Sequence, residues 1–375
     1  MSKPLEGLLV IDFTQFLSGP SATLRLHDLG ARIIKVEHFE HGDITRSLYA
    51  PQLNIGNDSA FFQAINRGKE SLAADLKNEN DLTLIRAIIE KADILVHNFR
   101  PSVMDRLGLG YTHAKALNSN IIYAEISGYG TQGPWRDKPG QDLLLQAVSG
   151  LAGLSGQNSD GPLPMGLAIA DNIAGAQLTQ GILAALIGED GAHVEISMLE
   201  AVLDFQFEPL TLFFQDGEPI DRGTVNAAHA LVGAPYGLYK TKDGYIALAM
   251  GAIPKLGELL GCEPLLEFTD SKQWFARRDE IKSIIANHLL NHTSQHWLSI
   301  LEPADIWCAE VLNWQQLIAH EGFKVLDMLQ TVSNASGENY VTTRCPIRFD
   351  DQVLKSDLAA PKIGQDSQTI RAQFS

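Results

Sequence analysis

The chain has 375 residues, of which 45% are hydrophobic and 20% are charged, and its 29 basic and 45 acidic side chains give a formal net charge of −16. This composition is typical of a folded protein long enough for two or three domains. The excess of negative charge disfavours nucleic acid as a partner, because nucleic acid is itself a polyanion. Cys262, Cys308 and Cys345 lie far apart without paired spacing, so we predict neither a disulfide framework nor a metal site.

The first residues, MSKPLEGLLVIDF, contain no basic segment followed by an apolar core. No export signal is therefore visible, and we expect a cytoplasmic protein. The longest apolar stretch, LAIADNIAGAQLTQGILAALI over residues 167–187, contains an Asp, an Asn, two Gln and two Gly. These residues would be costly in lipid, so we expect no membrane association.

Strand and helix patterns alternate over the first 130 residues. Short apolar, β-branched runs predict strands, and apolar residues three and four apart predict helices. The predicted strands are 7–13, 32–37, 93–99 and 120–130, and the predicted helices are 19–31 and 83–92. This alternation favours an α/β fold with a large doubly wound, Rossmann-like parallel sheet. No GxGxxG follows the first strand, which disfavours a nicotinamide cofactor.

The pattern changes after about residue 205. Residues 192–205 predict a strand that runs into a helix, residues 235–250 predict an antiparallel hairpin with KDG at its turn, and helical patterns continue to about residue 300. Residues 344–349 and 360–374 predict a strand and a helix that return to the first domain. We therefore expect a large domain of residues 1–205 and 325–375, a small α+β domain of residues 226–310, and linkers at 206–225 and 311–324.

Basic residues follow one predicted strand. Residues 98–108 (NFRPSVMDRLG) place Arg100 and Arg106 beyond a strand end, where open α/β sheets bind ligands and where guanidinium groups suit a phosphate. The aromatic Phe99 beside them suits packing against a purine. A solvated turn with surface arginines is the alternative. A second, turn-like segment, residues 66–77, carries three basic side chains with the same two interpretations: Arg67, Lys69 and Lys77.

Asp171 is the one charged residue in the apolar stretch 167–187. As a helix N-cap, its carboxylate would accept free backbone N–H groups, and the helix dipole would lower its pKa. Desolvation by Ala, Ile and Leu neighbours would instead raise that pKa. A carboxylate that is held by N–H groups but stripped of water also suits a nucleophile. The residues alone leave a plain cap and a catalytic nucleophile open.

Seven segments, taken together and in order, resemble the family III coenzyme A-transferases, also called the CaiB/BaiF family. They are GLLVIDFTQFLSGPSATLRLHDLGARIIKVEHFEHGDITR, NRGKESLAADLK, ADILVHNFRP, ISGYGTQGPWRDKPGQDLLLQAVSGL, PMGLAIADNIAG, VEISMLEAVL and PYGLYKTKDGYIALAMG. The resemblance extends from residue 5 to about residue 370. It implies transfer of coenzyme A from an acyl-CoA to a carboxylic acid, with CoA as a substrate and no prosthetic group. It also implies an interlocked homodimer, in which each subunit is a ring of large and small domains threaded through its partner.

The resemblance assigns the nucleophile to the Asp of the segment ADNIAG, which is Asp171. It also implies that CoA is held by residues Leu17, Ser18, His38, Ala74, Asp75, Leu76, Lys77, Asn98, Phe99, Arg100, Arg106, Pro139, Gly140, Gln141 and Asp142.

Three positions depart from the formyl-CoA transferases of this family. Leu17 replaces a Gln, and His38 replaces an Arg that meets a CoA phosphate. Their run of four glycines, which covers the active site, has no counterpart in residues 227–237. We therefore do not expect formate and oxalate as the acid pair.

Two alternatives remain on the same fold. One is an acyl-CoA racemase or isomerase, but the racemases of this fold carry a His where this chain has Gln141, and an amide cannot take up and return the α-proton. The other is a CoA-binding dimer without catalytic activity.

Overall fold

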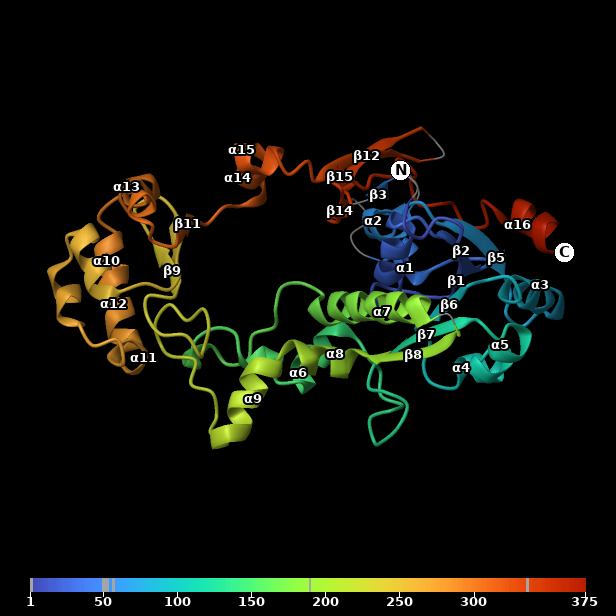
Figure 1. Ribbon diagram of the computed structural model, residues 1–375, viewed down its shortest axis with the longest axis horizontal. Coiled ribbons are helices and arrows are strands. Elements are labelled where there is room, and N and C mark those ends of the chain that lie inside the picture. Colours follow the sequence, from blue (N-terminus) through green and yellow to red (C-terminus); the bar gives the residue numbers. More distant parts are fainter. Residues whose placement is uncertain (1–2, 49–53, 56–57, 189, 335–336) are drawn as a thin grey trace. The chain divides into compact units, whose positions relative to one another are not determined.

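The computed structural model describes residues 3–48, 54–55, 58–188, 190–334 and 337–375, and the chain divides into two compact units (Figure 1). The first unit comprises Met1–Leu145, Ala168–Phe205 and Leu326–Ser375, and the second comprises Gln146–Leu167 and Gln206–Val325. The domain bounds expected from the sequence stay a prediction.

The predicted parallel sheet forms the centre of the first unit, and it has six strands. Its strand order is β5-β2-β1-β6-β7-β8. The strands are β1 (Leu9–Asp12), β2 (Arg32–His38), β5 (Glu70–Ala74), β6 (Ile94–His97), β7 (Ile122–Ser127) and β8 (Ala192–Ser197). The order reverses between β1 and β6, and open α/β sheets bind their ligands beyond the carboxyl ends of the strands at such a point.

Helices cover both faces of this sheet. On one face, α1 (Ser18–Asp28) and α7 (Ile169–Gly188) pack directly against each other (Figure 1). On the other face, α3 (Glu79–Ile89), α5 (Tyr111–Leu117) and α16 (Ser367–Phe374) bury their apolar sides in one core with the strands. The further helices of this unit are α2 (Ala60–Asn66), α4 (Val103–Arg106) and α8 (Met198–Phe205), and α6 (Asp142–Val148) begins in it.

Two expectations about local structure need correction. Residues 66–77 are not simply turn-like, because they contain the sheet strand β5, whose Leu72 is buried in the core and whose Ser71 donates a hydrogen bond to Glu37. Of the predicted strand 344–349, two residues pair, as β14 (Arg348–Phe349) with β15 (Gln352–Val353). The terminal helix begins at Ser367 and packs on α3 and β5, so the chain returns to the first unit as predicted. Short pairs complete this unit: β3 (Asn54–Ile55) with β4 (Asp58–Ser59), and β12 (Leu329–Ser333) with β13 (Asn339–Thr343).

The second unit contains the predicted hairpin. Strands β9 (Gly237–Lys240) and β10 (Tyr245–Leu248) are antiparallel, and β11 (Cys308–Glu310) joins them in the order β11-β10-β9. Helices α10 (Ile253–Leu260), α12 (Arg278–Leu289) and α13 (Ser294–Leu301) share a core with one face of this sheet. The other helices are α9 (Phe207–Asp216), α11 (Gln273–Ala276), α14 (Trp314–Ala319) and α15 (Glu321–Lys324).

Within the described ranges, no helix combines the length and the apolar character needed to cross a bilayer.

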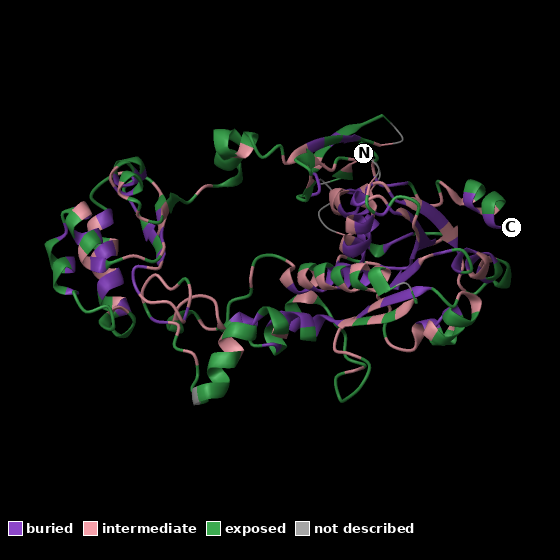
Figure 2. Cartoon of the chain, viewed as in Figure 1, coloured by how far each residue is buried: buried purple, intermediate pink, exposed green. Residues whose placement is uncertain are grey.

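Buried charges anchor the loop that follows β1. Figure 2 shows the centre of the parallel sheet as buried. The side chain of Asp12, the last residue of β1, is buried. Its carboxylate accepts hydrogen bonds from Thr14 N at 2.8 Å and Thr23 Oγ1 at 2.7 Å, and it pairs with Lys69 Nζ at 3.1 Å. Burial raises the pKa of Asp12, but the ammonium groups of Lys69 and Lys35 and these hydrogen bonds outweigh burial and hold the pKa below its usual value. The carboxylate therefore stays ionised.

We predict that Lys69→Met destabilises the fold by about 3–5 kcal/mol, because it leaves the buried Asp12 carboxylate without its ion-pair partner. Lys355→Met is the matched control, since Lys355 pairs with Asp327 at 2.8 Å on the surface, and its loss should cost less than about 1 kcal/mol. Urea denaturation gives both free energies of unfolding. Equal losses in the two variants would contradict the role given to the buried pair.

Candidate functional site

Asp171 is the third residue of α7, which begins at Ile169. The N-cap interpretation is therefore wrong, since an N-cap precedes the first helical residue. Instead, Asp142 caps the start of α7. Its Oδ1 accepts hydrogen bonds from Ala170 N at 2.7 Å and from Asp171 N at 3.2 Å. A carboxylate 28–29 positions away in sequence thus caps the helix that carries Asp171.

The surroundings of Asp171 raise its pKa to about 6, from an ordinary value of 3.8. Burial is the main cause, and the negative charge of Asp142 acts in the same direction. Hydrogen bonds from the side chain and the backbone of Ser18 oppose the shift. At neutral pH Asp171 is therefore mostly an ionised but basic carboxylate, which is the form that a nucleophile requires.

Gly175 lets α1 approach α7 at this point. It lies one turn after Asp171, on the same side of the helix. A Cβ added there would stand 2.5 Å from the backbone oxygen of Ser18, so any side chain would force the helices apart. The sequence prediction missed this residue. The sequence does contain a sign of it, because Gly175 lies inside a helical pattern. A glycine in a helix interior lowers helix stability by about 1 kcal/mol relative to alanine, so its presence indicates a packing requirement.

Asn98 fixes the loop that leads into α1. Its Oδ1 accepts a hydrogen bond from Gln15 N at 2.8 Å, and its Nδ2 donates one to Gln15 O at 2.7 Å. The loops after β1 and β6 are therefore joined at the point where the strand order reverses. This pairing holds Ser18, the buried first residue of α1, at the start of the helix.

The structure brings many of the predicted CoA contacts to one edge of the sheet. His38 ends β2 and Ala74 ends β5, and the two are register partners. Ser18 follows β1, and Asn98 follows β6. These residues thus lie at the carboxyl ends of four adjacent strands. Half-buried Leu17 directly precedes Ser18.

The basic residues near this edge fall into two groups. Lys77, Arg100 and Arg106 are exposed. In contrast, Arg67 is buried against Asp28 at 2.6 Å, and Lys69 is buried in the ion pair with Asp12. For these two the phosphate interpretation is wrong, because their charges already hold the fold together.

The remaining predicted contacts have roles in local structure. The Asp75 carboxylate closes a turn by accepting a hydrogen bond from Lys77 N at 2.9 Å. Leu76 and Phe99 pack against the core. Pro139, Gly140 and Gln141 are exposed in the segment before Asp142.

One cluster outside this edge has the spacing of metal ligands. Glu125, His193 and Glu195 place ligand atoms within 4.8 Å of one another. However, the Glu125 carboxylate already pairs with His97 at 2.8 Å and His193 at 3.3 Å. Burial raises the pKa of Glu125, but the hydrogen bond and charge of His97 and the charge of His193 outweigh it and hold the pKa low. Ion pairs therefore explain this cluster.

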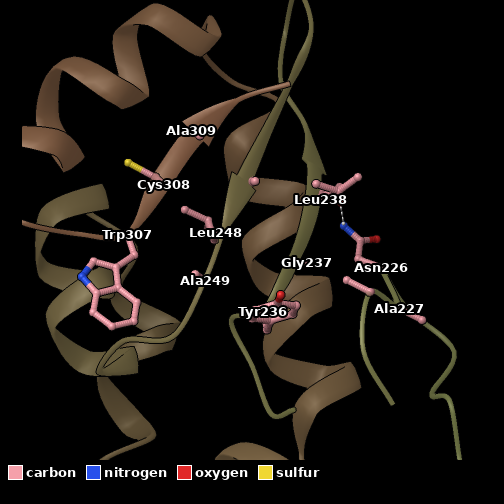
Figure 3. A pocket seen from close by; sticks show the side chains of 12 residues that line it. Asn226, Ala227, Tyr236, Gly237, Leu238, Leu248, Ala249, Trp307, Cys308 and Ala309 are labelled. Atoms are coloured by element: carbon pink, nitrogen blue, oxygen red, sulfur yellow. Dashed lines mark hydrogen bonds between the residues drawn. The ribbon is translucent and has the colours of Figure 1, made fainter. Parts of the chain in front are cut away.

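The second unit contains an apolar pocket of about 620 Å³ on its three-stranded sheet (Figure 3). Figure 3 shows Trp307 at one end and Asn226 and Ala227 at the other. Its wall includes several alanines, whose small side chains leave the hollow open: Ala227, Ala228, Ala247, Ala249 and Ala309. None of the lining residues is charged, so the pocket suits hydrocarbon and does not suit a phosphate.

Comparisons with known proteins agree on one family. A family model described as CoA-transferase family III matches residues 5–367. The chain is 34% identical over 321 residues to an acetyl-CoA:oxalate CoA-transferase of Acetobacter aceti, covering 83% of this chain and 81% of that protein. It is 29% identical over 388 residues to a succinate–glutarate CoA-transferase of Agrobacterium fabrum, covering 99% and 96%. A crystal structure of a CaiB/BaiF family protein from Brucella suis, 29% identical, superposes with a TM-score of 0.87 and full coverage of both chains.

We predict that Gly175→Ala lowers the free energy of unfolding by about 1–3 kcal/mol, because its new methyl group overlaps the backbone of α1. Gly188→Ala, at the other end of α7, is the matched control, since a Cβ there meets nothing within 4 Å. The control should be neutral or slightly stabilising. Chemical denaturation measures both, and an unchanged Gly175→Ala protein would refute the close packing.

Proposed function

The chain belongs to CoA-transferase family III and is a CoA-transferase, an enzyme that moves coenzyme A between an acyl-CoA and an acid, and from this premise we propose that Asp171 is its covalent nucleophile. The observation that carries the proposal is a half-buried carboxylate with a raised pKa, held by Ser18 at the first turn of α7.

The proposed reaction has two exchanges. An Asp171 oxygen attacks the acyl-CoA carbonyl carbon, the carbon–sulfur bond breaks, and a mixed anhydride and a CoA thiolate result. The thiolate then attacks the aspartyl carbonyl, which releases the donor acid and leaves an aspartyl–CoA thioester. The acceptor carboxylate attacks that thioester to form a second mixed anhydride, and the released thiolate attacks its acyl carbonyl. The new acyl-CoA leaves, and Asp171 is an ionised carboxylate again.

A carboxylate suits this exchange because both intermediates keep the energy of the thioester. A serine ester would be too stable to return CoA readily. Water would hydrolyse either intermediate, so the site must exclude it. The apolar residues near Asp171, such as the buried Ala170 and Ala174, are consistent with that requirement.

We place CoA at the carboxyl edge of the sheet. The exposed cations Lys77, Arg100 and Arg106 lie near the ends of β5 and β6, and phosphate groups favour such side chains. His38 at the end of β2 lies at the same edge and offers a further polar contact.

We propose that two copies form an interlocked dimer. Helix α9 exposes large apolar side chains, with Phe207 69% and Phe214 74% exposed, and such faces are typical of surfaces covered by a partner. Light scattering should give twice the chain mass of 41.0 kDa. A monomeric mass would contradict the dimer.

Gln141 argues against a racemase, since its amide neither takes up nor releases a proton as an acid or base near neutral pH. No titratable side chain stands at that position to act as the second acid or base.

We predict that hydroxylamine, added during turnover, converts Asp171 to a hydroxamate that peptide mass analysis locates. Acetyl-CoA and succinyl-CoA serve as donors, with oxalate and glutarate as acceptors, as the relatives' names suggest. Asp171→Asn should lose the modification and reduce transfer by roughly a thousandfold or more. Asp204→Asn, on the neighbouring helix α8, should retain both. Full transfer by Asp171→Asn would exclude the covalent route.

The raised pKa of Asp171 predicts a pH dependence. Because the ionised form attacks, the single-turnover rate should rise with pH through a midpoint near 6 and level off above about 7. Below the midpoint it should fall about tenfold per pH unit. Stopped-flow thiolate detection measures this. A rate that rises toward acid would show that the neutral acid reacts.

The phosphate contacts predict a selective effect on binding. Lys77→Ala and Arg106→Ala should each raise KM for the acyl-CoA about three- to tenfold with little change in kcat. Lys115→Ala, on the exposed side of α5, is the control. With an acyl thioester of dephospho-CoA, the rise in KM should be smaller for the variant of whichever residue meets the ribose phosphate. An unchanged KM in both variants would show that neither Lys77 nor Arg106 contacts CoA.

A further inference from the structure

Helix α7 has no side-chain cap from its own preceding residue. Ala168 stands directly before its first residue, Ile169, and offers no side-chain oxygen. The N–H groups of a first helical turn need acceptors. Asp142 supplies one through a single oxygen, which accepts from Ala170 N and from Asp171 N.

The backbone around Asp142 is held firmly. Asp142 is the first residue of α6, and Gly140, two residues earlier, lies against Gly128, just after β7. A Cβ added to Gly140 would stand 2.5 Å from the Gly128 Cα, so the two backbones are in direct contact. Gly128 O in turn accepts from Leu199 N of α8 at 3.1 Å. The backbone that leads into Asp142 is therefore packed against the end of β7, which α8 contacts in turn.

Asp142 also brings a negative charge to the site. Burial raises the pKa of Asp171 most; beyond burial, the groups that shift it are Asp142 from α6, which raises it, and Ser18 from α1, which lowers it. The charged residues of α8, the other helix that packs on α7, are not among them. A neutral cap such as Asn or Ser would satisfy the same amides without this repulsion.

We propose that Asp142 is a positioning residue for Asp171: it caps the first turn of α7 and holds a second negative charge beside the nucleophile. The inference rests on the proposed function of Asp171. In the resting enzyme the carboxylates of Asp142 and Asp171 repel each other. This repulsion disappears when Asp171 becomes an anhydride or a thioester, because residue 171 is neutral in both. Asp142 therefore makes Asp171 more basic and favours the covalent intermediates.

Two variants separate the cap from the charge. Asp142→Asn keeps a side-chain oxygen but removes the charge, and Asp142→Ala removes both. Asp142→Asn should unfold at nearly the wild-type temperature, and Asp142→Ala at a lower one. In both, the pH midpoint for thioester formation should move from about 6 toward 3.8. At pH 8 thioester formation by Asp142→Asn should slow by roughly three- to tenfold. Asp204→Asn is the control that removes a carboxylate of α8 and should leave the midpoint in place.

A midpoint that stays near 6 in Asp142→Asn overturns the role of the charge, and an unchanged unfolding temperature in Asp142→Ala overturns the cap. Carbon-13 NMR of aspartate carboxyl groups in the resting protein separates this inference from the proposed function, because it follows the titration of Asp171 without substrate. If that titration shifts in Asp142→Asn but the wild type forms no aspartyl thioester, the effect of the Asp142 charge on Asp171 stands and the covalent mechanism fails. If the thioester forms and the titration of Asp171 does not shift, the covalent mechanism stands and the role of the Asp142 charge fails.

Discussion

The contact between α1 and α7 at Gly175 is the constraint on which the site depends. Because this residue has no side chain, the first turn of α1 lies against α7, and Ser18 meets the Asp171 carboxylate one turn away. Hydrogen bonds from Ser18 keep that carboxylate usable as an anion, while burial and Asp142 make it basic. The raised pKa of about 6 is the balance of these opposing effects.

The start of α1 is itself held by buried polar groups. Lys35 Nζ donates to Thr14 O at 2.6 Å and pairs with Asp43 at 2.9 Å, and Asp12 accepts from Thr14. Asn98 joins the same loop to the end of β6. Buried charges of this kind contribute little net stability but are costly to break. Their arrangement ties the loop before Ser18 to the two strands between which the sheet order reverses.

Five of the six strands of the sheet were predictable because they are short apolar runs separated by periodic helices, and both signals are local. Strand β5 was missed, because its sequence ESLAA has no such apolar run. The hairpin of the second unit was predictable for the same reason. Asp171 was distinguishable because no other charge lies in its stretch. What local patterns missed depends on distant partners. The local sequence gives no sign that Arg67 and Lys69 are buried. Arg67 pairs in the interior with Asp28, and Lys69 pairs there with Asp12, both far earlier in the chain. Likewise, the cap of α7 comes from Asp142, so Asp171 could be mistaken for the cap.

The central claim is that Asp171 meets the thioester carbonyl while Ser18 holds it. A crystal structure of the Asp171→Asn protein with a bound acyl-CoA tests this claim most directly. We expect the substituted amide side chain at position 171 to lie about 3–3.5 Å from the carbonyl carbon, beside the Ser18 amide, with the CoA phosphates near Lys77 and Arg106. A thioester bound far from position 171, or a side chain at that position turned toward bulk water, would contradict it.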